Sequence, residues 1–124
     1  MKKIIFMALF ATIILGGVYG QTPPENRWLI GSWVRTEVEV EDGWSLTSTW
    51  IFNDNGSGRR QQIWTRGNER EDGSRRDFLF STSGTTIIIY YIANNNITGT
   101  TNLNITRIND QIVVIENNIY NKRN

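Results

Sequence analysis

From residue 28 onward, apolar and polar side chains alternate along the chain, and a helical period is absent. The alternation is clearest over residues 44–53, where Trp44, Leu46, Trp50 and Phe52 share one face. A repeat of two places successive side chains on opposite faces of an extended strand. The pattern therefore favours β-sheet over helix throughout the folded part of the chain.

Short turns rich in Gly, Asn and Asp, which tolerate positive φ, divide the chain into eight segments. We expect strands at about 28–40, 44–53, 59–66, 75–82, 85–93, 98–108, 111–116 and 119–123. Between them, the charged segment 67–74 is expected to be a mobile loop. Sequential short strands form an antiparallel meander, and closure into a barrel removes its two edges. The predicted fold is therefore all-β, an eight-stranded antiparallel up-and-down barrel.

The first expected strand carries valines and acidic residues in alternation. We expect Val34, Val38 and Val40 to face the core and Glu37 and Glu39 to face solvent. A carboxylate-based hydrolase needs two acids flanking a cleft, one with a pKa raised by burial. Acidic side chains on a solvated strand face do not meet that requirement.

The first 20 residues have the pattern of a secretory signal peptide. Lys2 and Lys3 precede an apolar run over residues 4–18, and small residues then allow cleavage before Gln21. A membrane anchor is the alternative, but the run is shorter than the roughly 20 residues that a spanning helix needs. We therefore expect a periplasmic or secreted protein with no stable membrane span after cleavage. Residues 21–27 are expected to form an extended leader, and residues 28–124 the barrel.

The composition excludes several function classes. The chain contains no cysteine and no histidine, so the usual zinc, haem and iron–sulfur ligands and imidazole-based triads are missing. Loss of Lys2 and Lys3 with the signal peptide leaves 11 basic and 12 acidic residues, a formal charge of −1. Nucleic-acid binding requires a concentrated positive field, which this balance does not supply. We expect no enzyme activity, no cofactor and no metal site.

Two short motifs resemble those of a known family. Leu29-Ile30-Gly31-Ser32-Trp33 resembles the Gly-x-Trp signature of lipocalins and their calycin relatives. Ile119-Tyr120-Asn121-Lys122 is similar to the closing strand of fatty-acid-binding proteins, which belong to the same group. The resemblance covers about residues 28–123 and is strongest with small bacterial lipocalin-like domains. Unlike the larger lipocalins, this chain has no C-terminal helical pattern and no disulfide.

The resemblance implies how one end of the barrel is closed. In that family the tryptophan of Gly-x-Trp packs against a basic residue of the last strands, as a cation over an indole. The closure residues here would be Gly31, Trp33 and Tyr120 with a basic partner. Three partners are possible, and the sequence does not choose among them: Lys122, Arg123 and Arg107.

A ligand site is expected in the lumen, lined by aromatic side chains with arginine at the mouth. The expected lining residues are Trp50, Phe52, Trp64, Phe78, Phe80 and Tyr90, with Tyr91 as the alternative to Tyr90. Arg66 or Arg76 would hold a carboxylate, because the guanidinium fork matches it. In the alternative interpretation the rings fill the barrel, and the arginine-rich hairpin is solvated and self-paired.

These patterns predict an exported, non-enzymatic protein that binds a small apolar or amphipathic ligand in the lumen. The alternative is a solid barrel that binds a protein partner through its loops, as an inhibitor or an envelope component. The two differ in the interior. A connected cavity of several hundred Å³ supports a ligand, whereas a packed interior favours the partner.

Overall fold

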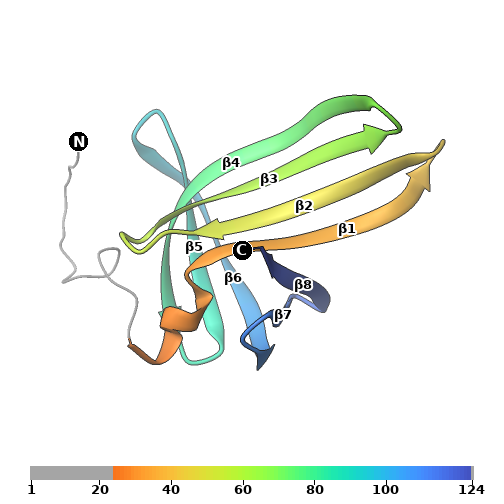
Figure 1. The fold of residues 1–124 in the computed structure, drawn as a ribbon. Coiled ribbons are helices and arrows are strands. Elements are labelled where there is room, and N and C mark those ends of the chain that lie inside the picture. The colour runs from red at the N-terminus through yellow and green to blue at the C-terminus, as the bar shows by residue number, and fades with distance from the viewer. Residues whose placement is uncertain (1–23, 124) are drawn as a thin grey trace.

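The computed structural model describes residues 24–123, so the predicted signal peptide and the start of the leader lie outside the described residues. A 3-10 helix, Pro24–Leu29, precedes eight strands (Figure 1). The strands are β1 Gly31–Glu41, β2 Trp44–Phe52, β3 Ser57–Arg66, β4 Glu69–Ser83, β5 Thr86–Ala93, β6 Asn96–Asn109, β7 Ile112–Ile115 and β8 Asn118–Arg123.

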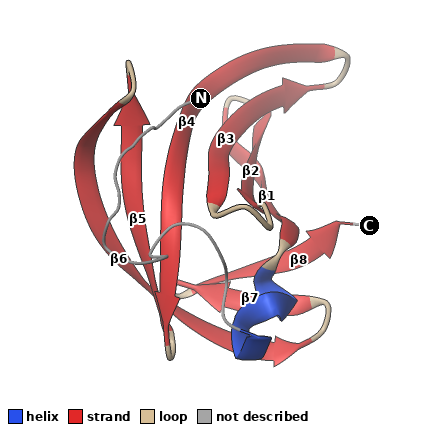
Figure 2. Cartoon of the chain, turned by 90° about the vertical axis from the view of Figure 1, so that its left-hand side faces the viewer, coloured by secondary structure: helices blue, strands red, loops and turns tan. Residues whose placement is uncertain are grey.

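The eight strands form a closed antiparallel barrel in up-and-down order, as predicted (Figure 2). β1 pairs with β2 over most of its length and with β8 at Ser32–Val34, which closes the ring. The two-residue turn between β5 and β6 shows why the connections are tight. Asn94 and Asn95 both have positive φ, at 54° and 66°, and this backbone matches the twist of a hairpin.

The segment preceding the barrel is helical where an extended leader was predicted. The 3-10 helix includes Trp28, which was expected to begin the first strand. Arg27 Nη1 lies 2.6 Å from Asp54 Oδ1 on the turn between β2 and β3, and this hydrogen-bonded ion pair lowers the pKa of the Asp54 carboxyl. The side-chain amide of Asn26 also donates to Thr82 Oγ1 at 3.0 Å. The helix is held in place by contacts with residues far away in the sequence, and no local sequence pattern reveals such contacts.

The predicted mobile loop over residues 67–74 is wrong. β4 begins at Glu69, so only two residues separate it from β3. Arg66 and Glu69 face each other across this hairpin, with Nε and Oε1 2.8 Å apart. The segment is polar because both of its faces are exposed, and it is a strand because β3 pairs with it.

The core lies inside the barrel toward the end covered by the 3-10 helix. Every buried apolar side chain is at most 9% exposed, and together they are Leu29, Trp33, Trp50, Phe52, Phe78, Phe80, Ile87, Ile89, Leu103, Ile105, Val113, Ile115 and Tyr120. The rings pack edge to face and stacked, with Phe52 and Phe80 5.1 Å apart between centroids. Such offset and T-shaped contacts are the favoured aromatic arrangements. This half of the barrel is filled.

The predicted phase of the first strand is also wrong. Trp33 is fully buried, so Val34, the next residue, faces outward, and Val38 and Val40, beyond the register irregularity that follows Glu37, are 76% and 45% exposed. Glu37 shares the inner face with Trp33 because both oppose inward residues of β2, Leu46 and Trp50. Burying the indole of Trp33 removes more apolar area from water than burying the valines would, so Trp33 decides which face of β1 points inward.

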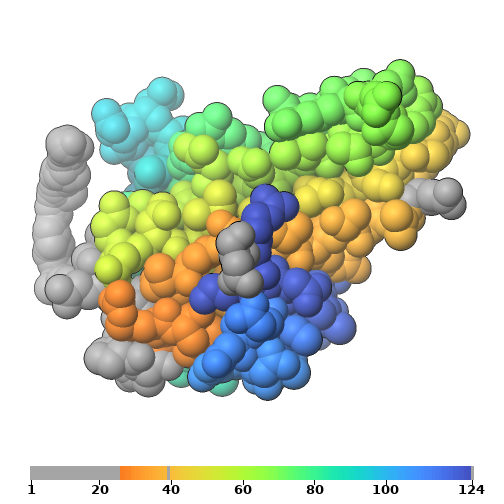
Figure 3. Space-filling model, viewed as in Figure 1, coloured from red at the N-terminus to blue at the C-terminus, as the bar shows by residue number. Residues whose placement is uncertain are grey.

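The first four strands extend well beyond the barrel. Past Val34, β1 has no partner on its β8 side, and β4 pairs with β5 only from Asp77 onward. The free parts, residues 35–41, 44–48, 62–66 and 69–76, form a four-stranded sheet that we call the arm. The arm projects to the upper right past β5–β8 (Figures 1 and 3). Its inner face continues the inner wall of the barrel, and no strand within residues 24–123 packs against it.

A close packing contact joins β3 to the core at Gly58. A Cβ atom there would lie 2.3 Å from Phe78 Cε1 and 2.4 Å from the Ile51 carbonyl oxygen. We therefore expect Gly58→Ala to lower the free energy of unfolding by about 1–3 kcal/mol, the usual range for overpacking. Gly99→Ala is the matched control, because nothing lies within 4 Å of that position. Urea unfolding measures both, and equal midpoints for the two variants would contradict the packing.

Candidate functional site

A recess of about 240 Å³ opens where the barrel meets the arm, and we call it the mouth recess. Side chains from β2, β3 and β5–β8, with one turn residue, line it: Trp50, Arg60, Tyr91, Thr101, Leu103, Ile115, Glu116, Asn118 and Tyr120. Leu103, Ile115 and Tyr120 belong to the packed core as well. The recess therefore has an apolar floor and a polar rim, which is the usual composition of a small-molecule site.

Two arginines face each other on the inner wall at the mouth. Arg60 on β3 and Arg76 on β4 are direct cross-strand partners. Each lies over an aromatic ring: Arg60 Cζ is 5.1 Å from the Trp50 centroid, and Arg76 Cζ is 3.7 Å from the Tyr91 centroid. Arg60 is half-buried and Arg76 is exposed, and each guanidinium gains cation–π attraction from the ring that it covers.

On their outer face, the same two strands place an arginine opposite an acidic residue. One position away from Arg60, Arg59 opposes Asp77, and the Nε–Oδ1 distance is 2.9 Å. On the inner face, by contrast, neither Arg60 nor Arg76 forms an ion pair with a described residue. Like charges directly opposite each other on a sheet are destabilising. The arginine pair therefore places two positive charges together at the mouth, and Glu116, the acidic residue of the recess, forms no ion pair with either of them.

The guanidinium of Arg60 is also incompletely hydrogen-bonded. Its Nε atom is buried and has no hydrogen-bond partner within the described part of the chain. A buried unsatisfied donor costs about 1–3 kcal/mol, more when it is charged. The one acidic residue on the rim, Glu116, accepts a hydrogen bond from the Asn104 backbone N–H at 2.7 Å. The polar atom that lacks a partner is thus a donor, which fits an acceptor from outside the chain.

The structure separates the predicted lumen residues into two groups. Phe52, Phe78 and Phe80 are at most 2% exposed and belong to the filled core. Trp50 lies at the boundary, in contact with the core and lining the mouth recess. The interior is therefore packed at one end and open at the other, a combination that neither sequence-based alternative contained.

The predicted lumen position of Tyr90 is wrong. Tyr90 pairs with Leu79 and Thr100 on the outer face, and the neighbouring Tyr91 opposes Phe78 on the inner face. The Tyr91 and Phe78 rings are 6.4 Å apart and nearly perpendicular. Tyr91 was the open alternative, and it is the tyrosine of β5 that reaches the mouth recess.

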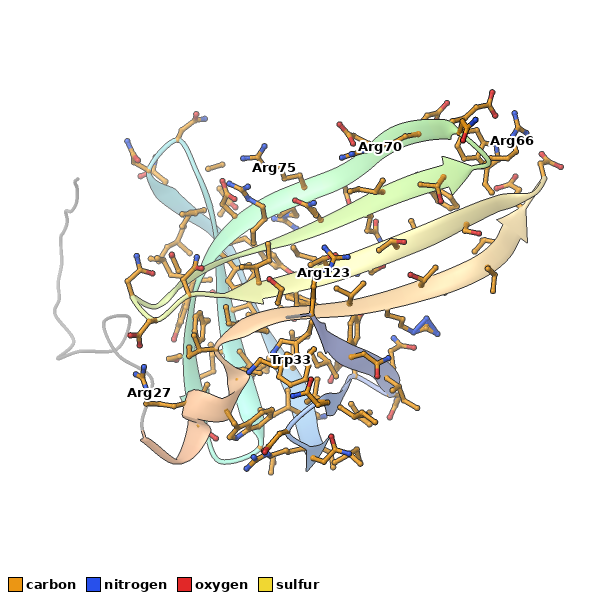
Figure 4. All side chains as sticks on the ribbon, viewed as in Figure 1. Arg27, Trp33, Arg66, Arg70, Arg75 and Arg123 are labelled. Carbon is orange, nitrogen blue, oxygen red and sulfur yellow. The ribbon has the colours of Figure 1, made fainter. Side chains whose placement is uncertain are left out.

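Trp64 and Arg66 do not line the mouth recess. Trp64 borders a second recess at the free end of the arm, together with Trp44 on β2. Arg66 stacks on Trp44, with its Cζ atom 4.6 Å from the ring centroid, and Figure 4 shows it far from Trp33. The predicted arginine Arg76 does lie at the mouth, whereas its partner Arg60 was not singled out. The register of β3 against Trp50 is the signal that identifies Arg60.

Three of the predicted closure residues, Gly31, Trp33 and Lys122, meet where β1 pairs with β8. Lys122 opposes Trp33 across β1 and β8, and its Nζ atom lies 5.4 Å from the indole centroid. Arg107 stacks on Trp28 instead, at 5.3 Å. Gly31 has φ of 133°, and a Cβ there would lie 3.0 Å from Lys122 Cε. Glycine is therefore required where the lysine stem crosses the strand.

The buried indole of Trp33 also fastens the 3-10 helix to the barrel. Its Nε1 donates to the Leu29 carbonyl at 2.8 Å, and its ring packs edge to face against Trp28 at 6.1 Å. Gly31, Trp33 and Lys122 thus form one packed group. Tyr120 on β8, 4% exposed, belongs to the same buried core but lines the mouth recess.

Comparison with protein families, with curated proteins and with solved structures finds no match for this chain. Within residues 24–123, no helix has the length and apolar character needed to cross a membrane. No group of three or more acidic, histidine or cysteine side chains in that range is placed to hold a metal ion. The mouth recess and the recess at the end of the arm are therefore interpreted from their own chemistry.

Proposed function

We propose that this protein is an exported, non-enzymatic binding protein that holds a small amphipathic anion in the mouth recess. The observation that carries the proposal is the buried, unpartnered Nε of Arg60 beside a second unpaired arginine, Arg76. The anionic head would lie on these two guanidinium groups. The apolar body would lie on Trp50, Leu103 and Tyr120.

A carboxylate is the head group that suits the arginine pair best. Its two oxygens match the guanidinium fork, so one group can accept from Nε and a terminal nitrogen of Arg60 at once. The same negative charge relieves the repulsion between Arg60 and Arg76. Charge-assisted hydrogen bonds of this kind are worth about 1.5–3 kcal/mol. Both costs of the unliganded site are thus removed by one ligand group.

The size of the recess limits the ligand. About 240 Å³ is below the roughly 300–1,000 Å³ of sites for drug-sized molecules. The packed rings of Phe52 and Phe78 block any deeper entry. A carboxylate with a single ring or a chain of up to about eight carbons fits these limits, and a longer chain would have to continue along the inner face of the arm.

Relationship to the calycin group is part of the proposal. It is supported by the eight-stranded closed barrel and by the contact between Trp33 of the Gly-x-Trp motif and Lys122 of the last strand. Export, to a periplasm or to the outside of the cell, is inferred from the signal-peptide pattern of residues 1–20. A lipocalin-like barrel acting on a small molecule outside the cytoplasm is consistent with both.

Isothermal titration calorimetry with octanoate and with octanamide tests the proposal. The two share an apolar chain and differ in head-group charge. We expect octanoate to bind at least about tenfold more tightly, a difference of about 1.4 kcal/mol, which is near the lower limit for charge-assisted hydrogen bonds. Equal affinities for the two ligands would show that the mouth recess is an apolar site without an anion clamp. Absence of binding by both would contradict the ligand-binding proposal and favour the protein-partner alternative.

A further inference from the structure

The second recess lies at the free end of the arm, away from the arginine pair. It encloses about 290 Å³ and is lined by Glu41, Asp42, Trp44, Trp64 and Glu71. Its lining combines two indole rings with three carboxylates, so its chemistry is opposite to that of the mouth recess. We propose that this recess binds a small organic cation of the quaternary-ammonium class.

The strand register builds this arrangement on one face of the arm. Trp44 on β2 opposes Glu41 on β1, and Trp64 on β3 opposes Glu71 on β4. Leu46, the next inward residue of β2, opposes Trp64. Each tryptophan therefore has a glutamate as its direct cross-strand neighbour, and all four side chains leave the sheet on its inner face. No strand of the described chain packs against that face.

The charge of this recess is not balanced by its neighbours. Glu41, Asp42 and Glu71 form no ion pair with any described residue. The nearby cation, Arg66, is paired with Glu69, and its Nη1 donates to the Asp42 carbonyl at 3.3 Å. Two half-buried indoles thus face a locally negative space.

Arg66 shows that the Trp44 ring accepts a cation. Its guanidinium carbon lies 4.6 Å from the Trp44 centroid, inside the roughly 6 Å range of cation–π attraction. Tryptophan is the strongest aromatic partner for a cation, and paired rings with nearby acids are the arrangement that recognises methylated ammonium groups. A metal ion fits poorly, because hard cations require several converging oxygen ligands and no three acidic side chains of the described residues are placed to hold one.

The test compares choline with 3,3-dimethylbutanol, its uncharged isostere, by calorimetry on the full-length protein. We expect choline to bind with millimolar or tighter affinity, and at least about tenfold more tightly than the neutral isostere, since the ring quadrupole attracts only the charged head. Equal binding of the two would show an apolar recess without cation selectivity and would overturn the proposal. So would the absence of choline binding.

Three variants and one control test whether the cation binds in this recess. Glu71→Gln, an exposed change that preserves shape, should weaken choline several-fold, while Glu37→Gln, on the same face but outside the recess, should not. Trp64→Leu should abolish choline selectivity. Arg66→Gln should tighten choline binding, because it frees the Trp44 ring and Glu69. Equal choline affinity in Glu71→Gln and the wild type would overturn the placement.

Discussion

Replacing Trp33 by alanine should lower the free energy of unfolding by about 3–5 kcal/mol, the cost of truncating a fully buried aromatic side chain. The indole is 0% exposed, so its loss leaves a cavity that the surrounding strands fill only in part. It also leaves the Leu29 carbonyl without the donor that lies 2.8 Å away. The closed end of the barrel and the 3-10 helix both depend on this one side chain. Urea unfolding, followed by circular dichroism, measures the loss.

Two further variants separate the contributions of the indole. Trp33→Phe retains most of the buried area but leaves the Leu29 carbonyl unpaired, and it should cost about 1–3 kcal/mol. Lys122→Met keeps the aliphatic stem and removes only the ammonium over the ring, so it should cost about 0.5–1 kcal/mol. A Trp33→Ala protein with an unchanged unfolding midpoint would refute the closure role.

Replacing Arg60 by glutamine should weaken octanoate binding by about tenfold to a hundredfold. The change removes charge-assisted hydrogen bonds worth about 1.5–3 kcal/mol, and each 1.4 kcal/mol is a factor of ten in affinity. Octanamide, which lacks the charge, should bind the variant and the wild type within a few-fold of each other. Calorimetry on both ligands provides the measurement.

The neighbouring residue supplies a matched control. Arg59→Gln makes the same chemical change one position away on the outer face, where Arg59 pairs with Asp77, and it should leave octanoate binding unchanged. The two substitutions should change the free energy of unfolding in opposite directions. Arg59→Gln should lower it, because the ion pair with Asp77 is lost. Arg60→Gln removes a like-charge pair and a buried unsatisfied donor, so the unliganded variant should be more stable than the wild type. Equal octanoate affinities for Arg60→Gln and Arg59→Gln would contradict the clamp.

The parts of the fold that were predictable are those with a clear apolar repeat. On β2, Trp44, Leu46, Trp50 and Phe52 all occupy the inner face, as their spacing indicated. Large apolar side chains two residues apart leave only one phase for a strand. The number and order of the strands followed from such segments and from their turns.

Segments without a unique apolar face were not predictable in the same way. β5 is apolar on both faces, so its sequence does not decide between Tyr90 and Tyr91, and only pairing with Phe78 does. Residues 69–76 of β4 carry no apolar repeat, because that part of the arm has no core to cover. Their strand conformation comes from the hairpin with β3.

The residues of the candidate site were only partly predictable from the sequence. An arginine clamp at the mouth was expected, and Arg76 lies there, but Arg66 lies at the end of the arm. The spacing of arginines does not reveal which of them face one another. That depends on the register between β3 and β4, including the irregularity between Gln61 and Ile63. Arg60 became visible only through the register of β3 against both neighbours, Trp50 on β2 and Arg76 on β4.

The most direct test of the proposed function is the position of bound octanoate, measured by the indole N–H signals of the five tryptophans in a nuclear magnetic resonance titration. We expect the Trp50 signal, at the floor of the mouth recess, to shift saturably with octanoate. The Trp33 signal, fixed by its bond to the Leu29 carbonyl, and those of Trp44 and Trp64 should remain in place. A Trp50 signal that stays constant while another indole titrates would contradict the mouth recess as the ligand site.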